Sequence, residues 1–139
     1  MRPEIHKDNL IVKLTFEFGV DILNFCDELS AMRKYVVADQ LLRAGLSVGN
    51  NSVEAQNAES KADFIHKMKI AAKEGDEVER LLLLCQAAKN YPDTTHLIKK
   101  IESINKVLNK MLNKIIATTK NNQLISKSPN QLITKKNNA

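Results

Sequence analysis

Apolar residues recur every three or four positions through most of this chain, the spacing that gathers them on one stripe of an α-helix. The period is clearest between residues 94 and 118, where steps of four and three alternate. The stripe in this segment consists of Leu97, Ile101, Ile104, Leu108, Met111 and Ile115. A heptad-like period of this kind suits helices that cross at the shallow angles of a bundle. We therefore expect an all-α protein.

Three earlier segments carry the same signal and are separated by short breaks. The four predicted helices span residues 9–29, 35–57, 60–89 and 94–118. With only 4 Gly and 3 Pro in 139 residues, the chain has too few turn-forming residues for an all-β fold. Because short connections make successive helices antiparallel, we predict an up-down-up-down antiparallel four-helix bundle over residues 1–118. Residues 119–139 are rich in Asn and Lys and contain no acid, so we expect a short, mobile, basic tail.

The second predicted helix contains Gly45 and Gly49, each of which costs about 1 kcal/mol relative to alanine in a helix interior. A helix that keeps both needs a compensating contact, and close packing against a neighbouring helix is the usual one. Polar residues mark the helix starts. The predicted N-caps are Asp8 or Asn9, Ser60, and Asp93 or Thr94.

Charge is distributed unevenly along the chain. Residues 1–88 hold 11 Lys or Arg and 14 Asp or Glu, whereas residues 89–139 hold 10 Lys and only 2 acids. Several lysines of the last predicted helix fall within a sector of about 80°, opposite its apolar stripe, and span about 22 Å along the axis. The candidate nucleic-acid-binding residues are Lys99, Lys106, Lys110 and Lys114, with Lys120 and Lys127 following in the tail.

Two interpretations of this lysine stripe stay open. Lysines spaced along a helix can meet successive phosphates of RNA or DNA without reading sequence. A lysine-rich face is also the ordinary solvated side of a bundle helix, and this one has no arginine to read base edges and no aromatic residue on which bases would stack.

We find no catalytic motif and no cofactor site in the sequence. The pairs Asp63/His66 and Asp93/His96 would lie roughly 40 Å apart at the two ends of a bundle, so they cannot share one metal ion, and we interpret them as helix caps with exposed histidines. Cys26 and Cys85 lie in apolar stretches, so buried free thiols are expected rather than a disulfide. The absence of a leader peptide or a long apolar run indicates a cytoplasmic protein.

Two polar signatures resemble those of a bacterial four-helix-bundle family, the proteins encoded in intervening sequences of large-subunit rRNA genes. Residues 43–56 read RAGLSVGNNSVEAQ and match R-A-x-x-S-x-x-x-N-x-x-E. Residues 60–79 read SKADFIHKMKIAAKEGDEVE and match S-x-x-D-F-x-x-K-x-x-I-A-x-K-E-x-x-E. The charged and polar motif positions are Arg43, Ser47, Asn51, Glu54, Asp63, Lys67, Glu74 and Glu77.

The resemblance implies a non-enzymatic bundle that assembles into a homo-oligomeric ring, a pentamer. A remoter similarity, to the accessory protein of diversity-generating retroelements, implies nucleic acid or a reverse-transcriptase-like enzyme as partner. This chain departs from the pattern at Arg80-Leu81, where relatives often carry Tyr-Trp. Small residues near the motif suggest close packing of the second and third helices. Because buried charges need partners, we expect Arg43 and Lys67 to pair with motif acids, within or between subunits.

We therefore predict a homo-oligomer that binds nucleic acid, or an enzyme acting on it, through the lysine stripe. The alternative is a structural or adaptor protein that has only protein partners and binds no nucleic acid.

Overall fold

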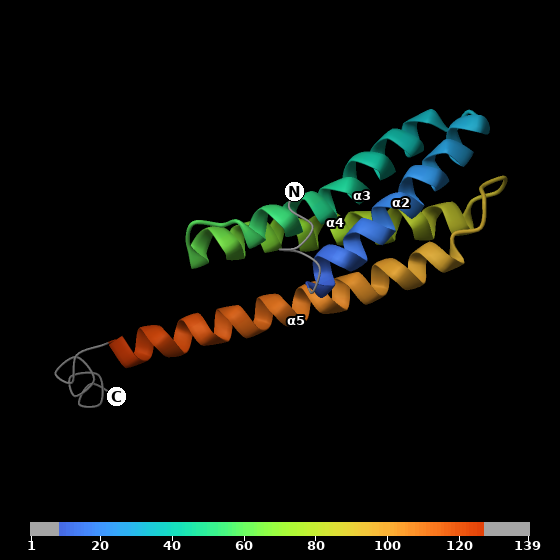
Figure 1. Cartoon of the computed structure of the whole chain (residues 1–139). Coiled ribbons are helices and arrows are strands. Elements are labelled where there is room, and N and C mark those ends of the chain that lie inside the picture. Colours follow the sequence, from blue (N-terminus) through green and yellow to red (C-terminus); the bar gives the residue numbers. More distant parts are fainter. Residues whose placement is uncertain (1–8, 127–139) are drawn as a thin grey trace.

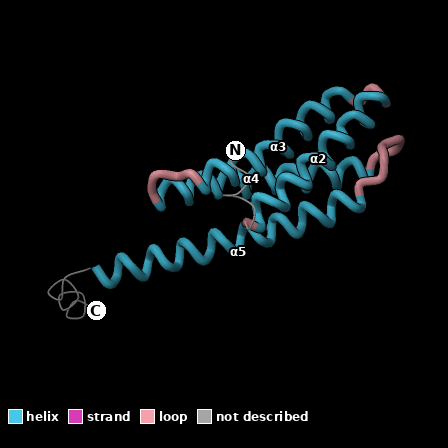
Figure 2. Tube along the Cα trace, viewed as in Figure 1, coloured by secondary structure: helices cyan, strands magenta, loops and turns pink. Residues whose placement is uncertain are grey.

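The computed structural model describes residues 9–126, which form four helices with no strand among them (Figure 1). The helices are α2 (Leu10–Ala31), α3 (Tyr35–Gln56), α4 (Lys61–Ala87) and α5 (Thr95–Ser126). The connections lie alternately at the two ends of the molecule, so each helix runs antiparallel to the one before it (Figure 2). Helix α3 packs on α2 and α4, while α5 packs on α4 and less extensively on α2. The predicted up-down-up-down arrangement is confirmed.

The core is built from the apolar stripes that the sequence indicates. Its largest fully buried members include Phe18, Ile22, Leu29, Leu41, Met68, Leu82, Ile101, Ile104 and Leu108. Near the start of α3, Ala38 is buried, and the larger Val37 beside it is only partly covered. The predicted stripes at the far ends of α4 and α5 are also half-buried, because fewer helices surround Phe64 and Ile115 there.

Helix starts carry side-chain caps, and the left-handed residues Arg33 and Asn90 follow the ends of α2 and α4. Asn9 accepts a hydrogen bond from the backbone N–H of Val12 (3.4 Å), and Ser60 accepts one from that of Asp63 (3.1 Å). At the end of α2, Arg33 has a φ of 62°, and the next N–H, of Lys34, donates to the carbonyl of Leu29 (2.8 Å). This bond closes a Schellman turn and reverses the chain into α3.

The α4–α5 connection assigns different roles to the two predicted caps. Asp93 accepts hydrogen bonds from both the backbone N–H and the hydroxyl of Thr95, at 3.2 and 2.7 Å. The buried hydroxyl of Thr94 instead donates to the carbonyl of Leu82 in α4 (3.0 Å). Asp93 thus orders the start of α5, while Thr94 joins the connection to α4.

The glycines of α3 lie where α2 comes closest. A Cβ added to Gly45 would stand 2.9 Å from Cγ2 of Ile22, and one added to Gly49 would stand 3.2 Å from Cβ of Thr15. The expected close packing is confirmed, but our assignment of these glycines to a contact between α3 and α4 is wrong. Both face α2, because their positions on α3 lie on the side away from Arg43.

A third close approach joins α4 to α5 through a buried amide. A Cβ on Gly75 would fall 2.1 Å from Oδ1 of Asn105. The Nδ2 of Asn105 donates to the Gly75 carbonyl (3.3 Å), while its Oδ1 is buried without a hydrogen-bond partner. Glycine is needed at this position of α4 because it leaves room for the amide of α5.

Helix α5 is longer than the sequence analysis predicted. It continues through 32 residues to Ser126, past the expected end at Thr118, so residues 119–126 belong to the helix and not to a tail. The physical reason is the absence of any helix-breaking residue before Pro129, since Asn and Thr lower helix propensity without stopping a helix. The rest of the predicted tail, residues 127–139, lies outside the described part of the chain.

Candidate functional site

The predicted lysine stripe lies on the outer face of α5. Lys99, Lys106, Lys110, Lys114 and Lys120 are all exposed, and none of the ion pairs within residues 9–126 involves them. Lys127, the last predicted member, lies outside the described residues. We call these five described lysines the α5 lysine face.

Helix α5 has little negative charge to offset the lysines of this face. Glu102 is its only acid, so nothing acidic follows within α5 to neutralise the lysines beyond it. Lys100 points elsewhere, toward α2, where its ammonium group pairs with the carboxylate of Asp21. Serine and asparagine side chains that can donate hydrogen bonds are exposed between the lysines, at Ser103, Asn109 and Asn113. Such a surface can bind phosphates but offers no stacking platform for bases.

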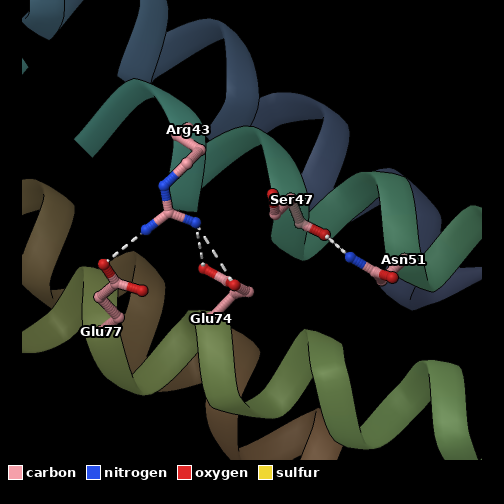
Figure 3. A network of polar contacts seen from close by, with 5 residues as sticks. All are labelled: Arg43, Ser47, Asn51, Glu74 and Glu77. Carbon is pink, nitrogen blue, oxygen red and sulfur yellow. Dashed lines mark hydrogen bonds and ion pairs between the residues drawn. The ribbon is translucent and has the colours of Figure 1, made fainter. Parts of the chain in front are cut away.

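The charged residues of the family motif meet across α3 and α4 (Figure 3). The Arg43 guanidinium donates to Glu77 Oε1 at 2.7 Å and to Glu74 Oε2 at 3.3 Å. The Glu77 hydrogen bond, together with the charges of Glu74 and Glu77, raises the pKa of Arg43. Further along the seam, Lys67 pairs with Glu54 at 2.9 Å, and that contact raises the pKa of Lys67. The prediction that Arg43 and Lys67 pair with motif acids is confirmed within one chain.

These ion pairs are more exposed than a buried-charge argument implies. The Arg43 side chain is 56% exposed, whereas Glu74 beneath it is 15% exposed. Ser47 and Asn51 form no bridge to α4: the Asn51 amide donates to the backbone carbonyl of Ser47 on its own helix (2.9 Å; Figure 3). Asp63 contributes the backbone N–H that Ser60 caps. The motif residues therefore hold α3 against α4 and close α4's first turn.

An apolar groove between α2 and α3 was not predicted from the sequence. It has a volume of about 510 Å³, and Phe16, Val20, Leu23, Leu46 and Val53 are among its lining residues. We call it the α2–α3 groove. Phe16, Val20 and Leu23 recur at helical spacing but lie off the core stripe of α2, and that second stripe is the signal that could have revealed the groove.

The remaining candidates for chemistry have structural roles. The Cys26 thiol is buried and donates to the Ala38 carbonyl (3.4 Å), and burial, with a smaller effect of Asp27 and Asp39, raises its pKa to about 11. Cys85 is also buried and free, and burial raises its pKa. A raised pKa keeps both thiols protonated and unreactive near neutrality. His66 and His96 are exposed, and no group of three His, Cys, Asp or Glu within residues 9–126 is placed to hold a metal ion.

Comparison with known proteins gives a consistent result. A family model described as 23S rRNA-intervening sequence protein matches residues 7–114. A solved structure of a protein with unknown function from the S23 ribosomal protein family of Bacteroides thetaiotaomicron is 34% identical to this chain. That alignment covers 74% of this chain and 98% of the other, with a TM-score of 0.71. No curated protein matches significantly. Among the described helices, none is long and apolar enough to cross a membrane.

Proposed function

We propose, from the premise that this chain belongs to the 23S rRNA-intervening sequence protein family, that it is a cytoplasmic, non-enzymatic, homo-oligomeric bundle. Its α5 lysine face binds RNA or DNA without reading sequence. In a complex with an enzyme that processes nucleic acid, such as a reverse transcriptase, the α5 lysine face brings the nucleic-acid substrate of that enzyme to the oligomer.

The observation that carries the proposal is a run of exposed lysines along one helix, none of which forms an ion pair with a described residue. Arg43, Lys67 and Lys100 are each matched by an acid within the chain. The α5 lysine face has no such match among the described residues, and its positive potential is left for an external polyanion. Successive lysines at Lys106, Lys110 and Lys114 stand one turn apart, about 6 Å along the helix, a distance similar to that between neighbouring phosphates of a strand.

The oligomer is proposed as a pentameric ring on the family resemblance. Exposed apolar side chains support association of copies, because a monomer that keeps Phe16 64% exposed and Val36 73% exposed leaves large apolar groups in water. In a ring, each copy repeats the α5 lysine face, so weak phosphate contacts act together and the apparent affinity rises by multivalency.

The test is a fluorescence-anisotropy titration of a 30-nucleotide RNA and a DNA duplex at two salt concentrations. Replacing Lys99, Lys106, Lys110 and Lys114 by Glu is expected to weaken binding at least about 100-fold at low salt, because phosphate contacts become repulsive. The matched control makes the same change of charge at four exposed lysines on α2 and α4. These are Lys13, Lys61, Lys69 and Lys73.

We expect the control variant to keep affinity within about tenfold of the parent, the part due to net charge alone. Equal losses in both variants would show that only total charge matters and would overturn the α5 assignment. A ring that binds neither RNA nor DNA at low salt would overturn nucleic-acid binding and favour the adaptor function.

A further inference from the structure

The α2–α3 groove is apolar and open, and two aspartates lie toward its end at the α2–α3 turn. Phe16, Val20 and Leu23 from α2 are 64%, 44% and 47% exposed along it. Toward the α2–α3 turn, Asp27 follows Leu23 by one turn on the same face of α2. From α3, Asp39 precedes the lining residue Leu46 by two turns. The Cys26 thiol contacts the Ala38 carbonyl, so Asp27 and Asp39, the residues that follow these two, lie near each other. Neither forms an ion pair within the described residues.

A second apolar surface lies on the other side of α3. The Arg43–Glu77 pair fixes the register between α3 and α4. Val36 lies seven residues before Arg43, and Leu84 lies seven residues after Glu77, so this register places the two beside one another two turns away. Val36 is 73% exposed and Leu84 is 53% exposed. We call this pair the Val36–Leu84 patch.

Two exposed arginines lie near the patch, and Asp39, which also faces the groove, lies one turn after Val36. Arg80 lies one turn before Leu84 on α4, and Arg33 lies in the turn before α3. Both side chains are exposed, and neither forms an ion pair with a described residue. The groove therefore has the unpaired Asp27 toward one end, and the Val36–Leu84 patch has the unpaired Arg80 one turn from Leu84.

We propose that the α2–α3 groove binds the Val36–Leu84 patch of a second copy of this chain, with Arg80 of that copy beside Asp27. This inference rests on the proposed ring. A contact that uses one patch on both partners closes as a dimer, so a ring with an odd number of copies needs two different, complementary patches on every copy. The groove and the Val36–Leu84 patch are such a pair, and burial of their apolar groups would drive association.

A mixing experiment tests this pairing directly. Phe16→Asp places a charge in the groove and leaves the Val36–Leu84 patch intact. Leu84→Asp places a charge in the patch and leaves the groove intact. Each variant alone is expected to be a monomer by light scattering, near the 15.6 kDa chain mass. An equimolar mixture is expected to form a one-to-one dimer that grows no further, because only one intact groove and one intact patch can meet. Leu10→Asp is the control, since Leu10 is 57% exposed at the start of α2.

The outcomes distinguish failure of the proposed ring from failure of the pairing between groove and patch. A parent protein that is itself monomeric would overturn the ring and, with it, this interface. A ring that survives Leu84→Asp but not Phe16→Asp would leave oligomerisation in place and show that the groove binds something other than the patch, such as the groove of another copy. Two monomeric variants that fail to pair on mixing would overturn the complementarity. Circular dichroism of each variant, matching that of the parent, excludes unfolding as the cause.

Discussion

The seams on either side of α3 and the outer face of α5 differ in whether their side chains have partners inside the chain. In the seams, Gly45 leaves room for Ile22, and Arg43 is matched by Glu74 and Glu77. On α5, the exposed lysines form no ion pair with a described residue, and Glu102 is the one acid of the helix. Both regions are rich in polar residues, so composition alone does not separate them. Internal pairing does, because a charge that is satisfied inside the chain holds the fold, and one that is not remains available to a ligand.

The largest expected effect on stability comes from a core substitution where α2 packs on α3. Ile22→Ala should lower the free energy of unfolding by about 2–5 kcal/mol, because a fully buried side chain is removed opposite Gly45, which has no side chain to fill the space. Urea denaturation followed by circular dichroism measures the change. Leu10→Ala, on an exposed residue of the same helix, should shift stability by less than about 0.5 kcal/mol. Similar losses in both variants would contradict the assignment of α2's inner face.

A smaller effect is expected from filling the close approach itself. Gly45→Ala should cost about 1–2 kcal/mol, because its Cβ meets Ile22 at 2.9 Å and the clash outweighs the better helix propensity of alanine. Gly19→Ala is the control on the facing helix, where a Cβ would stand 3.7 Å from Leu46, an ordinary contact. That variant should be stabilised by about 0.5–1 kcal/mol, so opposite signs in thermal unfolding are the prediction.

The ion pairs of the α3–α4 seam should contribute less than its apolar contacts. A double-mutant cycle with Arg43→Met and Glu77→Gln is expected to give a favourable coupling well below the Gly45 effect, because the arginine is exposed and its charge is screened by water. The coupling should shrink when denaturation is repeated in high salt, since exposed ion pairs are screened. A coupling that ignores salt would show that packing, and not charge, joins these two side chains.

The smallest effect on stability is expected on α5. Replacing Lys99, Lys106, Lys110 and Lys114 by Gln should leave the unfolding midpoint almost unchanged, because none of them pairs with a described residue. The same variant should reduce the salt dependence of RNA binding, with the slope of log K against log salt smaller by up to about 3, as expected when four single-strand phosphate contacts are lost. A large loss of stability with an unchanged slope would reverse the comparison between α5 and the seams.

Most of the fold was predictable because periodicity is a local property of the sequence. The stripes through Phe18, Leu41, Leu82 and Ile104 identify all four buried faces, and the ends of the first three helices are marked by residues such as Ser60. The end of α5 was missed, because nothing in residues 119–126 breaks a helix and the polarity of that segment was read as disorder.

The candidate surfaces were only partly predictable, since they depend on which helices become neighbours. The motif positions indicated that Arg43 and Lys67 would find acids, but not that the pairs lie on the outside of the α3–α4 seam. The α2–α3 groove was not predicted, because Phe16 and Leu46 are 30 residues apart in the sequence and line one groove only when α2 and α3 pack together. The positions of the α5 lysines were predicted, and the pairing of Lys100 with Asp21 required the structure.

The buried amide of Asn105 has a consequence for how precisely α5 is seated. A heptad-like stripe looks much the same after a shift of seven residues, so apolar packing alone would allow α5 to slide along α4 by two turns. Asn105 removes that degeneracy, because only opposite Gly75 does its amide find both space and a carbonyl. A slip of seven residues would place the amide opposite Met68 or Leu82, whose side chains would fill that space. One polar side chain, whose own Oδ1 has no hydrogen-bond partner, thus fixes the register of the longest described helix against the other three.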